Sequence, residues 1–253
     1  MAPGTLPPLR VAVIADIHAN LAALEACLDS VDEAGVDEVW CLGDVVGYGP
    51  DPNACAELVR ERCSLCLAGN HDLAVLGELE VEAFSESAAA AVTWTKDVIG
   101  ETALEFLGGL EPAGQRDGVD LCHASPRDPI WEYVLTREQA GECLDVQSER
   151  ICLIGHSHVA LFFTRADGER GNVRGAQAAD GSLIDVSAGR WLVNPGSVGQ
   201  PRDGDPRAAW LALDADAGTA LFQRVPYEIE KTAEAITAAG LPKPLADRLF
   251  LGQ

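Results

Sequence analysis

Short apolar runs alternate with helix-like segments over the first seventy residues of the chain. The runs have the length of buried strands and are followed by polar loops, which is typical of strand ends. They lie at residues 10–15, 36–42 and 64–68. Helix-like segments separate them at residues 21–34 and 51–62. Strands that alternate with helices predict βαβ units and a mainly parallel sheet.

The two helix-like segments have recognisable ends. In 21–34 the apolar residues repeat at helical spacing, Asn20 is a suitable N-cap and Gly35 is a suitable stop. The second segment begins with the pair Asp51-Pro52. Proline is tolerated there because N–H groups in the first turn of a helix have no intrahelical partner, so its missing N–H costs nothing. We therefore expect both helices to begin and end at these positions.

The middle of the chain is more helical, and the part after Val159 contains short strands separated by turns. Helices are predicted at 85–99, 136–147, 229–239 and 245–251, with a turn or short helix at 101–107 and strands at 118–123 and 151–155. Further strands at 161–165, 183–186, 191–193, 208–213 and 221–225 predict a second, more antiparallel sheet. No repeat or long polar linker divides the chain, so we expect one α/β domain with two sheets over residues 1–253.

Composition and charge limit the classes of function. The chain has 253 residues, 47% of them hydrophobic, and can bury a sizeable core. Its 18 Lys and Arg against 40 Asp and Glu give a formal net charge of −22, which repels nucleic-acid backbones and anionic membranes. We expect neither as a partner. A small phosphorylated ligand would need a local cation, such as a bound metal ion.

The sequence shows no signal for membrane insertion or for secretion. No apolar stretch is long enough to span a bilayer, and residues 1–10 lack the apolar core of a signal peptide. A cytoplasmic location is expected, where the eight cysteines stay reduced. Cys63 and Cys66 form a C-x-x-C, which could be redox-active or half of a zinc site. Because no second such pair exists, we favour a buried strand along residues 63–68.

The histidines are few and share one pattern. All five lie in loops that follow predicted apolar strands, together with acidic residues and an asparagine. Because the carboxyl ends of strands in an open α/β sheet face one crevice, these loops are expected to bring their side chains together. The set comprises Asp16, His18, Asp44, Asn70, His71, His123, His156 and His158. Such a cluster predicts a metal site with room for two ions.

The ligand types define the chemistry of this site. Imidazole and carboxylate together suit Mn, Fe, Zn or Ni, and a carboxylate can bridge two cations. Two ions roughly 3.5–4 Å apart can clamp a phosphate and turn a bound water into hydroxide at neutral pH. They would also let an anionic protein attract an anionic substrate. We therefore expect two divalent or trivalent transition-metal ions as cofactors.

The same motifs resemble those of a known family. The order Asp-x-His, Gly-Asp, Gly-Asn-His-Asp, His and Gly-His-x-His over residues 16–158 is similar to that of the calcineurin-like metallophosphoesterases. The segments 43–53, 125–133 and 194–202 resemble a bacterial branch that includes asymmetrical diadenosine tetraphosphate hydrolases. The resemblance implies a two-sheet αββα sandwich with the metal site at the carboxyl ends of the strands, and it favours manganese or iron.

The resemblance also implies a role for each residue of the set. Asp16, His18 and His158 would bind one metal, Asn70, His123 and His156 the other, and Asp44 would bridge them. A hydroxide held between the metals would attack phosphorus in line. His71 would stabilise the transition state and protonate the departing oxygen, and Asp72 would orient its ring.

The chain departs from the family pattern at three places. Ala19 and Ala124 stand where glycine is usual, and each extra methyl is expected to fit only if the backbone there is not at positive φ. Residues 46–48, Val-Gly-Tyr, occupy the stretch that carries an arginine in the protein phosphatases. The resemblance therefore argues against a phosphoprotein substrate and leaves phosphate binding to the metals and to Arg127 or Arg202.

Other features allow two interpretations each. Tyr48, Trp131 and Tyr133 can stack on a nucleobase or belong to the core. The glycine-containing loop 194–199 could present N–H groups to a phosphate, but a tight turn beneath the metal loops is favoured. The Glu-rich segment 77–86 is interpreted as a solvated surface, with a mobile flap as the alternative.

These observations predict a phosphohydrolase that acts on a small phosphorylated substrate, a nucleotide by resemblance. We expect asymmetrical cleavage of a dinucleoside polyphosphate such as diadenosine tetraphosphate. A general or cyclic-nucleotide phosphodiesterase is the alternative. A protein phosphatase or a non-catalytic metal-binding scaffold is less favoured, the scaffold because His71 and Asp72 are both present.

Overall fold

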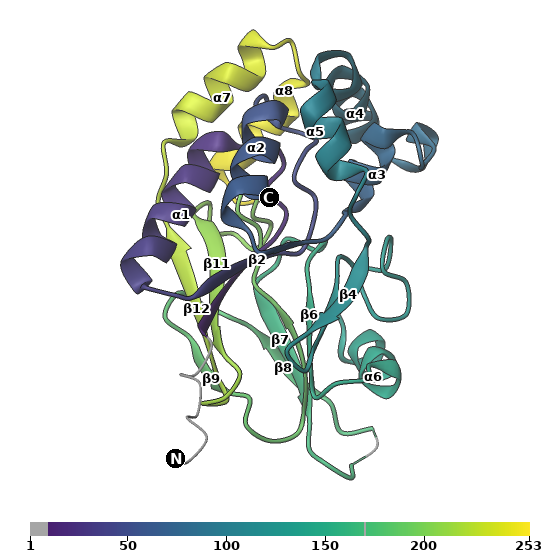
Figure 1. The fold of residues 1–253 in the computed structure, drawn as a ribbon, viewed down its shortest axis with the longest axis vertical. Helices are drawn as coiled ribbons and strands as arrows, with labels where there is room; N and C mark the ends of the chain where they lie inside the picture. The colour runs from purple at the N-terminus through teal and green to yellow at the C-terminus, as the bar shows by residue number, and fades with distance from the viewer. Residues whose placement is uncertain (1–9, 170) are drawn as a thin grey trace, which may run out of the picture.

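The computed structural model describes residues 10–169 and 171–253 and contains two six-stranded sheets (Figure 1). The first sheet has the order β3 (Leu65–Cys66), β2 (Glu38–Cys41), β1 (Arg10–Ile14), β11 (Ala208–Asp214), β12 (Thr219–Val225), β9 (Leu183–Asp185). The second has the order β4 (Ala113–Arg116), β5 (Val119–Cys122), β6 (Ile151–Ile154), β10 (Arg190–Asn194), β7 (Leu161–Arg165), β8 (Arg174–Gln177). Residues 1–9, part of the stretch where the sequence shows no signal peptide, lie outside the described residues.

The helices lie close to their predicted positions. They are α1 (Leu21–Ala34), α2 (Pro52–Arg62), α3 (Asn70–Leu76), α4 (Glu86–Val98), α5 (Glu101–Leu107), α6 (Arg137–Val146), α7 (Ile229–Ala238) and α8 (Lys243–Asp247), with short 3-10 turns η1 (Val81–Ala83) and η2 (Arg248–Phe250). Helix α3 begins where only a loop was expected, and the predicted helix 245–251 divides into α8 and η2. None of the helices in the described part of the chain combines the length and apolar character that crossing a membrane requires.

Local signals at the first helix act as predicted. The side chain of Asn20 caps α1 by accepting a 3.2 Å hydrogen bond from the N–H of Ala23. Gly35 ends the helix in the left-handed conformation, at φ 63°. The N–H of Gly35 donates to the carbonyl of Asp32 at 3.1 Å. The contacts at Asn20 and Gly35 satisfy groups at the helix ends that would otherwise lack partners.

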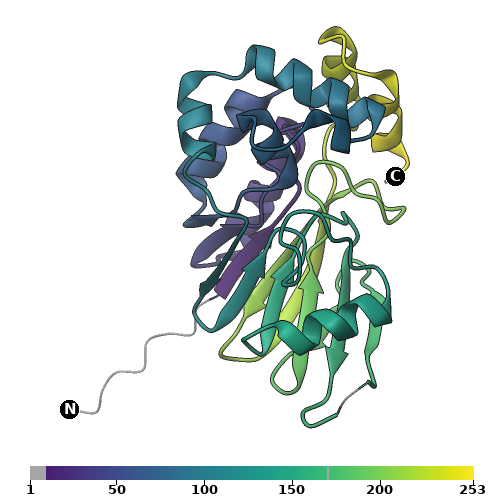
Figure 2. The same ribbon diagram turned by 90° about the vertical axis from the view of Figure 1, so that its right-hand side faces the viewer.

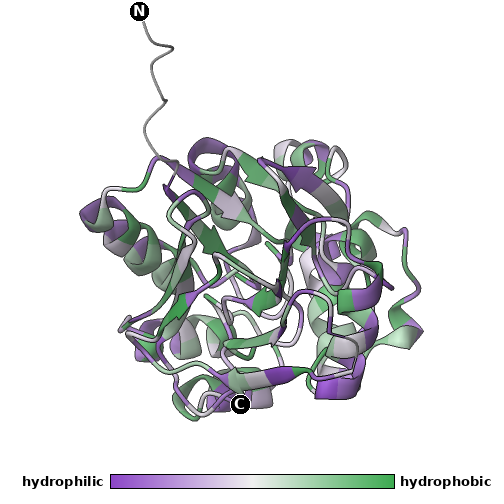
Figure 3. Ribbon diagram, turned by 90° about the horizontal axis from the view of Figure 1, so that it is seen from below, coloured by the Kyte–Doolittle hydropathy of each residue, from purple (hydrophilic) through white to green (hydrophobic). Residues whose placement is uncertain are grey.

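The strands divide their side chains between separate cores. In β1, Val11 and Val13 face the second sheet, whereas Ala12 and Ile14 pack against α1, because side chains alternate across a strand. Alternate residues of β6 divide in the same way between the first sheet and α6. The result is a layered sandwich in which α1 and α2 cover the first sheet and α6 covers the second (Figure 2). The expected αββα architecture is confirmed. Each helix contains both hydrophilic and hydrophobic residues along its length (Figure 3).

The assignment of late strands to one separate sheet is wrong. Strands β11, β12 and β9 extend the first sheet, and β10, β7 and β8 extend the second. In particular, β11 pairs antiparallel with β1, and β10 pairs parallel with β6. An apolar pattern shows that a segment forms a strand, but it carries no signal for which free edge the strand will join.

The loop 194–199 holds the end of β1 in place. The hydroxyl of Ser197 donates a 2.7 Å hydrogen bond to the carbonyl of Asp16, and the N–H of Gly199 donates to the same carbonyl at 3.0 Å. The amide of Asn20 donates to the carbonyl of Gly199 at 2.8 Å. The favoured interpretation of this loop as a structural turn is therefore confirmed.

Gly199→Ala is expected to destabilise the fold. A Cβ at this position would clash with the carbonyl oxygen of Ile17, so the loop after β1 would have to move. Overpacking of this kind costs about 1–3 kcal/mol. Gly114→Ala is the matched control, because its Cβ would meet nothing nearer than Leu67 Cδ2 at 3.9 Å. Urea unfolding measures both variants, and equal losses of unfolding free energy would contradict the tight fit at Gly199.

Candidate functional site

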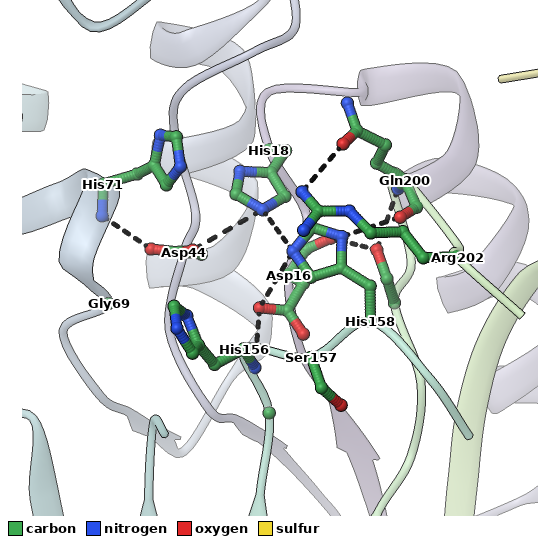
Figure 4. A network of polar contacts seen from close by, with 12 residues as sticks. Asp16, His18, Asp44, Gly69, His71, His156, Ser157, His158, Gln200 and Arg202 are labelled. Carbon is green, nitrogen blue, oxygen red and sulfur yellow. Dashed lines mark hydrogen bonds and ion pairs between the residues drawn. The ribbon is translucent and has the colours of Figure 1, made fainter. Parts of the chain in front are cut away.

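Polar residues that follow five strands meet at one end of the sandwich, and Figure 4 shows those that follow β1, β2, β3 and β6. Strands β1, β2 and β3 are parallel neighbours, and so are β5 and β6, so the carboxyl ends within each set lie on one side. The predicted ligands there are at most 3% exposed: Asp16, His18, Asp44, Asn70, His123, His156 and His158. His71 and Asp72 are equally buried. The structure therefore brings the predicted set together.

Five of these residues have a left-handed backbone. They are Asp16, His18, Asp44, His156 and His158, with φ between 51° and 63°. This conformation costs a residue with a side chain about 1–2 kcal/mol, so it persists only where the surroundings impose it. Here the N–H of Asp16 donates to the carbonyl of Gly43 at 3.0 Å, and that of His18 donates to the carbonyl of Asp44 at 2.9 Å. The two loops of the first sheet thus hold each other in the strained form.

Ala19 belongs to the same strained segment. From the sequence, we expected the methyl group of Ala19 to fit only if the backbone there was not at positive φ. The φ of Ala19 is 51°, so this expectation is wrong. The residue is held from both sides, because its N–H donates to Val45 at 2.9 Å and its carbonyl accepts from Asp51 at 3.0 Å. Ala124 is not among the residues at positive φ, as expected.

One group of ligand atoms surrounds His18 and His158. Together with Asp16 and Asp44, these residues place ligand atoms within 4.8 Å of one another. Each of the two imidazoles has its Nδ1 next to a main-chain carbonyl, at 3.2 Å for His18 and 2.7 Å for His158. Since a carbonyl only accepts, Nδ1 carries the proton and Nε2 presents a lone pair. The two Nε2 atoms lie 3.0 Å apart, an arrangement that a shared cation would stabilise.

A second group is formed by Asp44, His123 and His156. The Nδ1 of His123 lies 2.9 Å from a main-chain carbonyl, which leaves its Nε2 lone pair facing Asn70 Oδ1 at 3.1 Å. Asp44 is common to both groups. Its Oδ1 accepts from the N–H of His71 at 2.8 Å, and its Oδ2 lies 3.5 Å from His18 Nε2 and 3.6 Å from His123 Nε2.

The electrostatics of the cluster fit bound cations. Among the described residues, Asp16 Oδ2, Asp44 Oδ2 and His156 Nε2 are buried without a hydrogen-bond partner. Burial raises the pKa of Asp44 to about 7 and lowers the pKa of His123 to about 4 and of His156 to about 2. Buried carboxylates and neutral imidazole lone pairs that face one another are costly alone and are a favourable donor set for transition metals. The residues present therefore fit two such ions.

His71 lies beside the two groups with its ring free of polar contacts. Its Nδ1 has no partner among the described residues. The ring packs against Tyr48 and Phe84, at centroid distances of 4.4 and 5.0 Å, and against Gly47, where a Cβ would clash with it. Burial lowers the pKa of His71 well below its usual value.

Asp72 does not orient the ring of His71, which corrects the expectation from the sequence. Its carboxylate accepts from the N–H groups of Val45, Val46 and Gly69, at 3.2, 3.0 and 2.9 Å. Because Asp72 lies in the first turn of α3, its side chain turns back to main-chain donors. Asp72 therefore fixes the loops that carry Asp44 and His71.

A cavity of about 320 Å³ opens over the cluster. Of the predicted substrate contacts, Tyr48, Trp131, Tyr133 and Arg202 line it together with Asp44, His71, His156 and His158. The ring of Tyr133 lies 4.2 Å from that of His156. The predicted aromatic and cationic contacts are therefore within reach of a ligand at the cluster.

Phe84 and Arg248 also line the cavity, although neither was predicted as a substrate contact. Phe84 lies within the Glu-rich segment 77–86 and packs edge-on against Trp131 at 5.1 Å. The only indication of this in the sequence was that residues 77–86 could form a mobile flap. Arg248 reaches the cavity from η2, and nothing in its local sequence marks it.

Other candidates lie away from the cluster. Arg127 does not line this cavity and pairs instead with Glu132 at 3.1 Å and with Glu142. In the described part of the chain, the potential metal-binding groups include neither Cys63 nor Cys66. The expected buried strand along 63–68 is reduced to Leu65–Cys66, and its residues are half-buried.

Comparison with known proteins agrees with this geometry. Residues 9–217 match the calcineurin-like phosphoesterase superfamily domain. An uncharacterised protein of Methanocaldococcus jannaschii is 38% identical over 248 residues, which cover 96% of this chain and 98% of that protein. This similarity therefore extends over nearly the full length of both chains.

Two further proteins give structural and functional context. The crystal structure of a metallophosphoesterase from Sphaerobacter thermophilus has 40% sequence identity and a TM-score of 0.87, and the match covers 98% of this chain and 100% of that one. The symmetrical bis(5'-nucleosyl)-tetraphosphatase of Erwinia tasmaniensis is 37% identical over 67 residues, 25% of this chain and 24% of that enzyme. The first match spans the whole fold, whereas the second is local.

Metal binding is expected to release more protons at pH 6 than at pH 8. Without metal, the pKa of Asp44 is raised to about 7, so its carboxyl is mostly protonated at pH 6 and mostly ionised at pH 8. The histidines are already neutral in this range because burial lowers their pKa values. A cation requires the carboxylate, so its affinity should rise as pH rises, by up to about tenfold per unit for each proton released.

Titration calorimetry with Mn²⁺, repeated in two buffers of different ionisation enthalpy at each pH, counts these protons. Asp97→Asn is the control, since Asp97 is exposed and lies on α4, outside the cluster. An equal proton count at the two pH values would contradict the raised pKa of Asp44.

Proposed function

The chain belongs to the calcineurin-like phosphoesterase superfamily and is therefore a hydrolase, and from this premise we propose that it is a dinuclear metal-dependent phosphohydrolase acting on a small nucleotide. The finer proposal is asymmetrical cleavage of a dinucleoside polyphosphate such as diadenosine tetraphosphate. The observation that carries the proposal is the pair of ligand groups that share Asp44 at the base of an aromatic cavity.

In this proposal the ligand groups hold the two ions. Asp16, His18 and His158 would hold one, Asn70, His123 and His156 would hold the other, and Asp44 would contribute to both. When bound, such ions neutralise phosphate charge and lower the pKa of water, which supplies a nucleophile at neutral pH. Burial of the ligands excludes bulk water, so these charges act with little screening.

His71 is proposed to act on the departing oxygen. Its ring is fixed by aromatic packing and lines the cavity, with Nδ1 buried against Gly47, so Nε2 is the nitrogen proposed to hold the proton. Burial keeps the imidazole neutral when the cavity is empty, whereas a bound phosphate anion would raise its pKa. The protonated form thus becomes available when substrate is present. Asp72 acts as a positioning residue through the loops that carry His71 and Asp44.

The cavity wall supports a nucleotide. Phe84, Trp131 and Tyr133 offer aromatic faces on which a base can stack, and Arg202 supplies a guanidinium near the ligand groups. The local similarity to a bis(5'-nucleosyl)-tetraphosphatase adds support for a polyphosphate. That relative cuts symmetrically, whereas residues 43–53, 125–133 and 194–202 resemble the asymmetrical enzymes. Analysis of the reaction products decides between symmetrical and asymmetrical cleavage.

The Mn-loaded protein is expected to convert diadenosine tetraphosphate to ATP and AMP. Chromatography of the nucleotides identifies the bond that is cut. Asp44→Asn is the control and should be inactive, because it removes the carboxylate common to both ligand groups. ADP as the only product would replace asymmetrical by symmetrical cleavage. Hydrolysis of bis(p-nitrophenyl) phosphate without any nucleotide product would shift the substrate to general phosphodiesters.

His71→Ala is expected to keep both metal ions and to lose most of the rate. A general acid typically contributes about 10²–10⁴-fold, so kcat should fall within that range. Elemental analysis of the purified variant gives the metal content, and the same assay gives the rate. Loss of one ion per chain would show instead that His71 is a ligand, and an unchanged kcat would remove it from the reaction.

A further inference from the structure

Arg202 and Arg248 line the cavity without an acidic partner. In the described part of the chain neither forms an ion pair, whereas Arg165, Arg207 and Arg224 each pair with an aspartate. The chain has 40 Asp and Glu against 18 Lys and Arg, so acidic partners are abundant. Two half-buried guanidinium groups left without one at a cavity therefore require another explanation.

Gln200 holds the two arginines next to each other. Its side-chain oxygen accepts from Arg202 at 3.0 Å and from Arg248 at 3.0 Å. The main-chain carbonyl of Gln200 accepts from His158 Nδ1 at 2.7 Å, and the N–H of Arg202 donates to the carbonyl of His158 at 3.0 Å (Figure 4). The arginine pair is thus attached directly to a residue of the first ligand group.

A neutral amide positions these two charges without compensating them. Burial and, to a smaller extent, the nearby charge of Arg202 lower the pKa of Arg248. Arg202 also donates to the hydroxyl of Tyr48 at 3.3 Å, which is another neutral partner. Guanidinium groups with only neutral partners in a partly buried site match the oxygens of a phosphate, which would also remove the repulsion.

We infer, on the basis of the proposed function, that Arg202 and Arg248 bind a second phosphate next to the one at the ligand groups. The cavity then selects ligands with two adjacent phosphates over ligands with a single phosphate. Arg248 lies beyond residue 217, where the match to the family domain ends. Arg202 lies within the matched residues, so only the contribution of Arg248 comes from the C-terminal segment of this chain.

The test is a comparison of two ligands by titration calorimetry on the Mn-loaded protein. One is AMP, and the other is α,β-methylene ADP, whose two phosphorus atoms are joined through a methylene group that the enzyme cannot hydrolyse. We expect the unsubstituted protein to bind the second ligand at least about tenfold more tightly, as one charge-assisted phosphate contact provides. Arg248→Gln should remove most of this preference while the Kd for AMP changes by less than about twofold.

Two further variants separate a phosphate contact from a structural effect. Arg248→Lys keeps the charge and should retain part of the preference. Arg137→Gln removes an equal charge from an exposed position on α6 and should leave the preference intact. An unchanged ratio of the two Kd values in Arg248→Gln, or an equal loss for both ligands, would overturn the inference, as would the absence of any preference in the unsubstituted protein.

The same measurement separates this inference from the proposed function, because binding needs no turnover. A protein that hydrolyses no phosphoester would refute the proposed function, and the ratio of Kd values would still report on the arginine pair. Normal hydrolysis with an unchanged ratio in Arg248→Gln would refute the arginine pair alone.

Discussion

The carboxylate of Asp44 lies between the two groups of ligand atoms with one oxygen anchored and the other unpartnered. The anchor is the N–H of His71, so the main chain that carries the proposed acid also fixes the shared ligand. The free oxygen is within 3.6 Å of imidazole nitrogens from both sheets. A buried carboxylate in that position is costly unless cations lie beside it, and its raised pKa expresses this cost. The metal-free site is therefore a poorly compensated charge cluster, and folding and metal binding are linked through it.

The backbone of the site is strained because its ligands must converge on one point. Strands end beneath the cluster, and short loops must turn sharply to direct ligands from adjacent strands toward one point. Asp16, His18 and Asp44 have a left-handed backbone in the loops after β1 and β2, where the N–H groups of Asp16 and His18 donate to the carbonyls of Gly43 and Asp44. The loop 194–199 then locks the Asp16 turn from the other side. Close approach of Gly69 to Asp44, where a Cβ would clash with the carboxylate, completes the packing. Rigid positions of this kind reduce the reorganisation needed when charge develops on a substrate.

What the sequence could predict depended on how local the signal was. The cap at Asn20 and the stop at Gly35 act within a few residues, and both follow from residue type. The gathering of the ligands within each sheet also followed, because the ends of parallel strands share an edge, but the sequence did not show that β5 and β6 belong to a second sheet whose edge meets the first. The pairing of β11 with β1 did not follow, since register and edge choice depend on contacts between distant segments. Asp72 was predicted to orient His71, but in the first turn of α3 its carboxylate accepts from main-chain donors instead. Arg248 was not predicted, because its contact with Gln200 joins segments far apart in the chain.

The overall charge and the local charge of the cavity have opposite signs. At −22 the protein repels a polyphosphate at long range, and this repulsion is screened over about 8–10 Å at physiological salt. Inside that distance the ligand meets the cluster that fits two cations and the uncompensated pair Arg202 and Arg248. Attraction is thus confined to the cavity, where burial limits screening. A surface that is acidic elsewhere disfavours binding of long polyanions, because few of their phosphates could reach the cations. The short polyphosphate proposed as substrate would place its charge near the cavity, and the acidic surface would then contribute to selection by length.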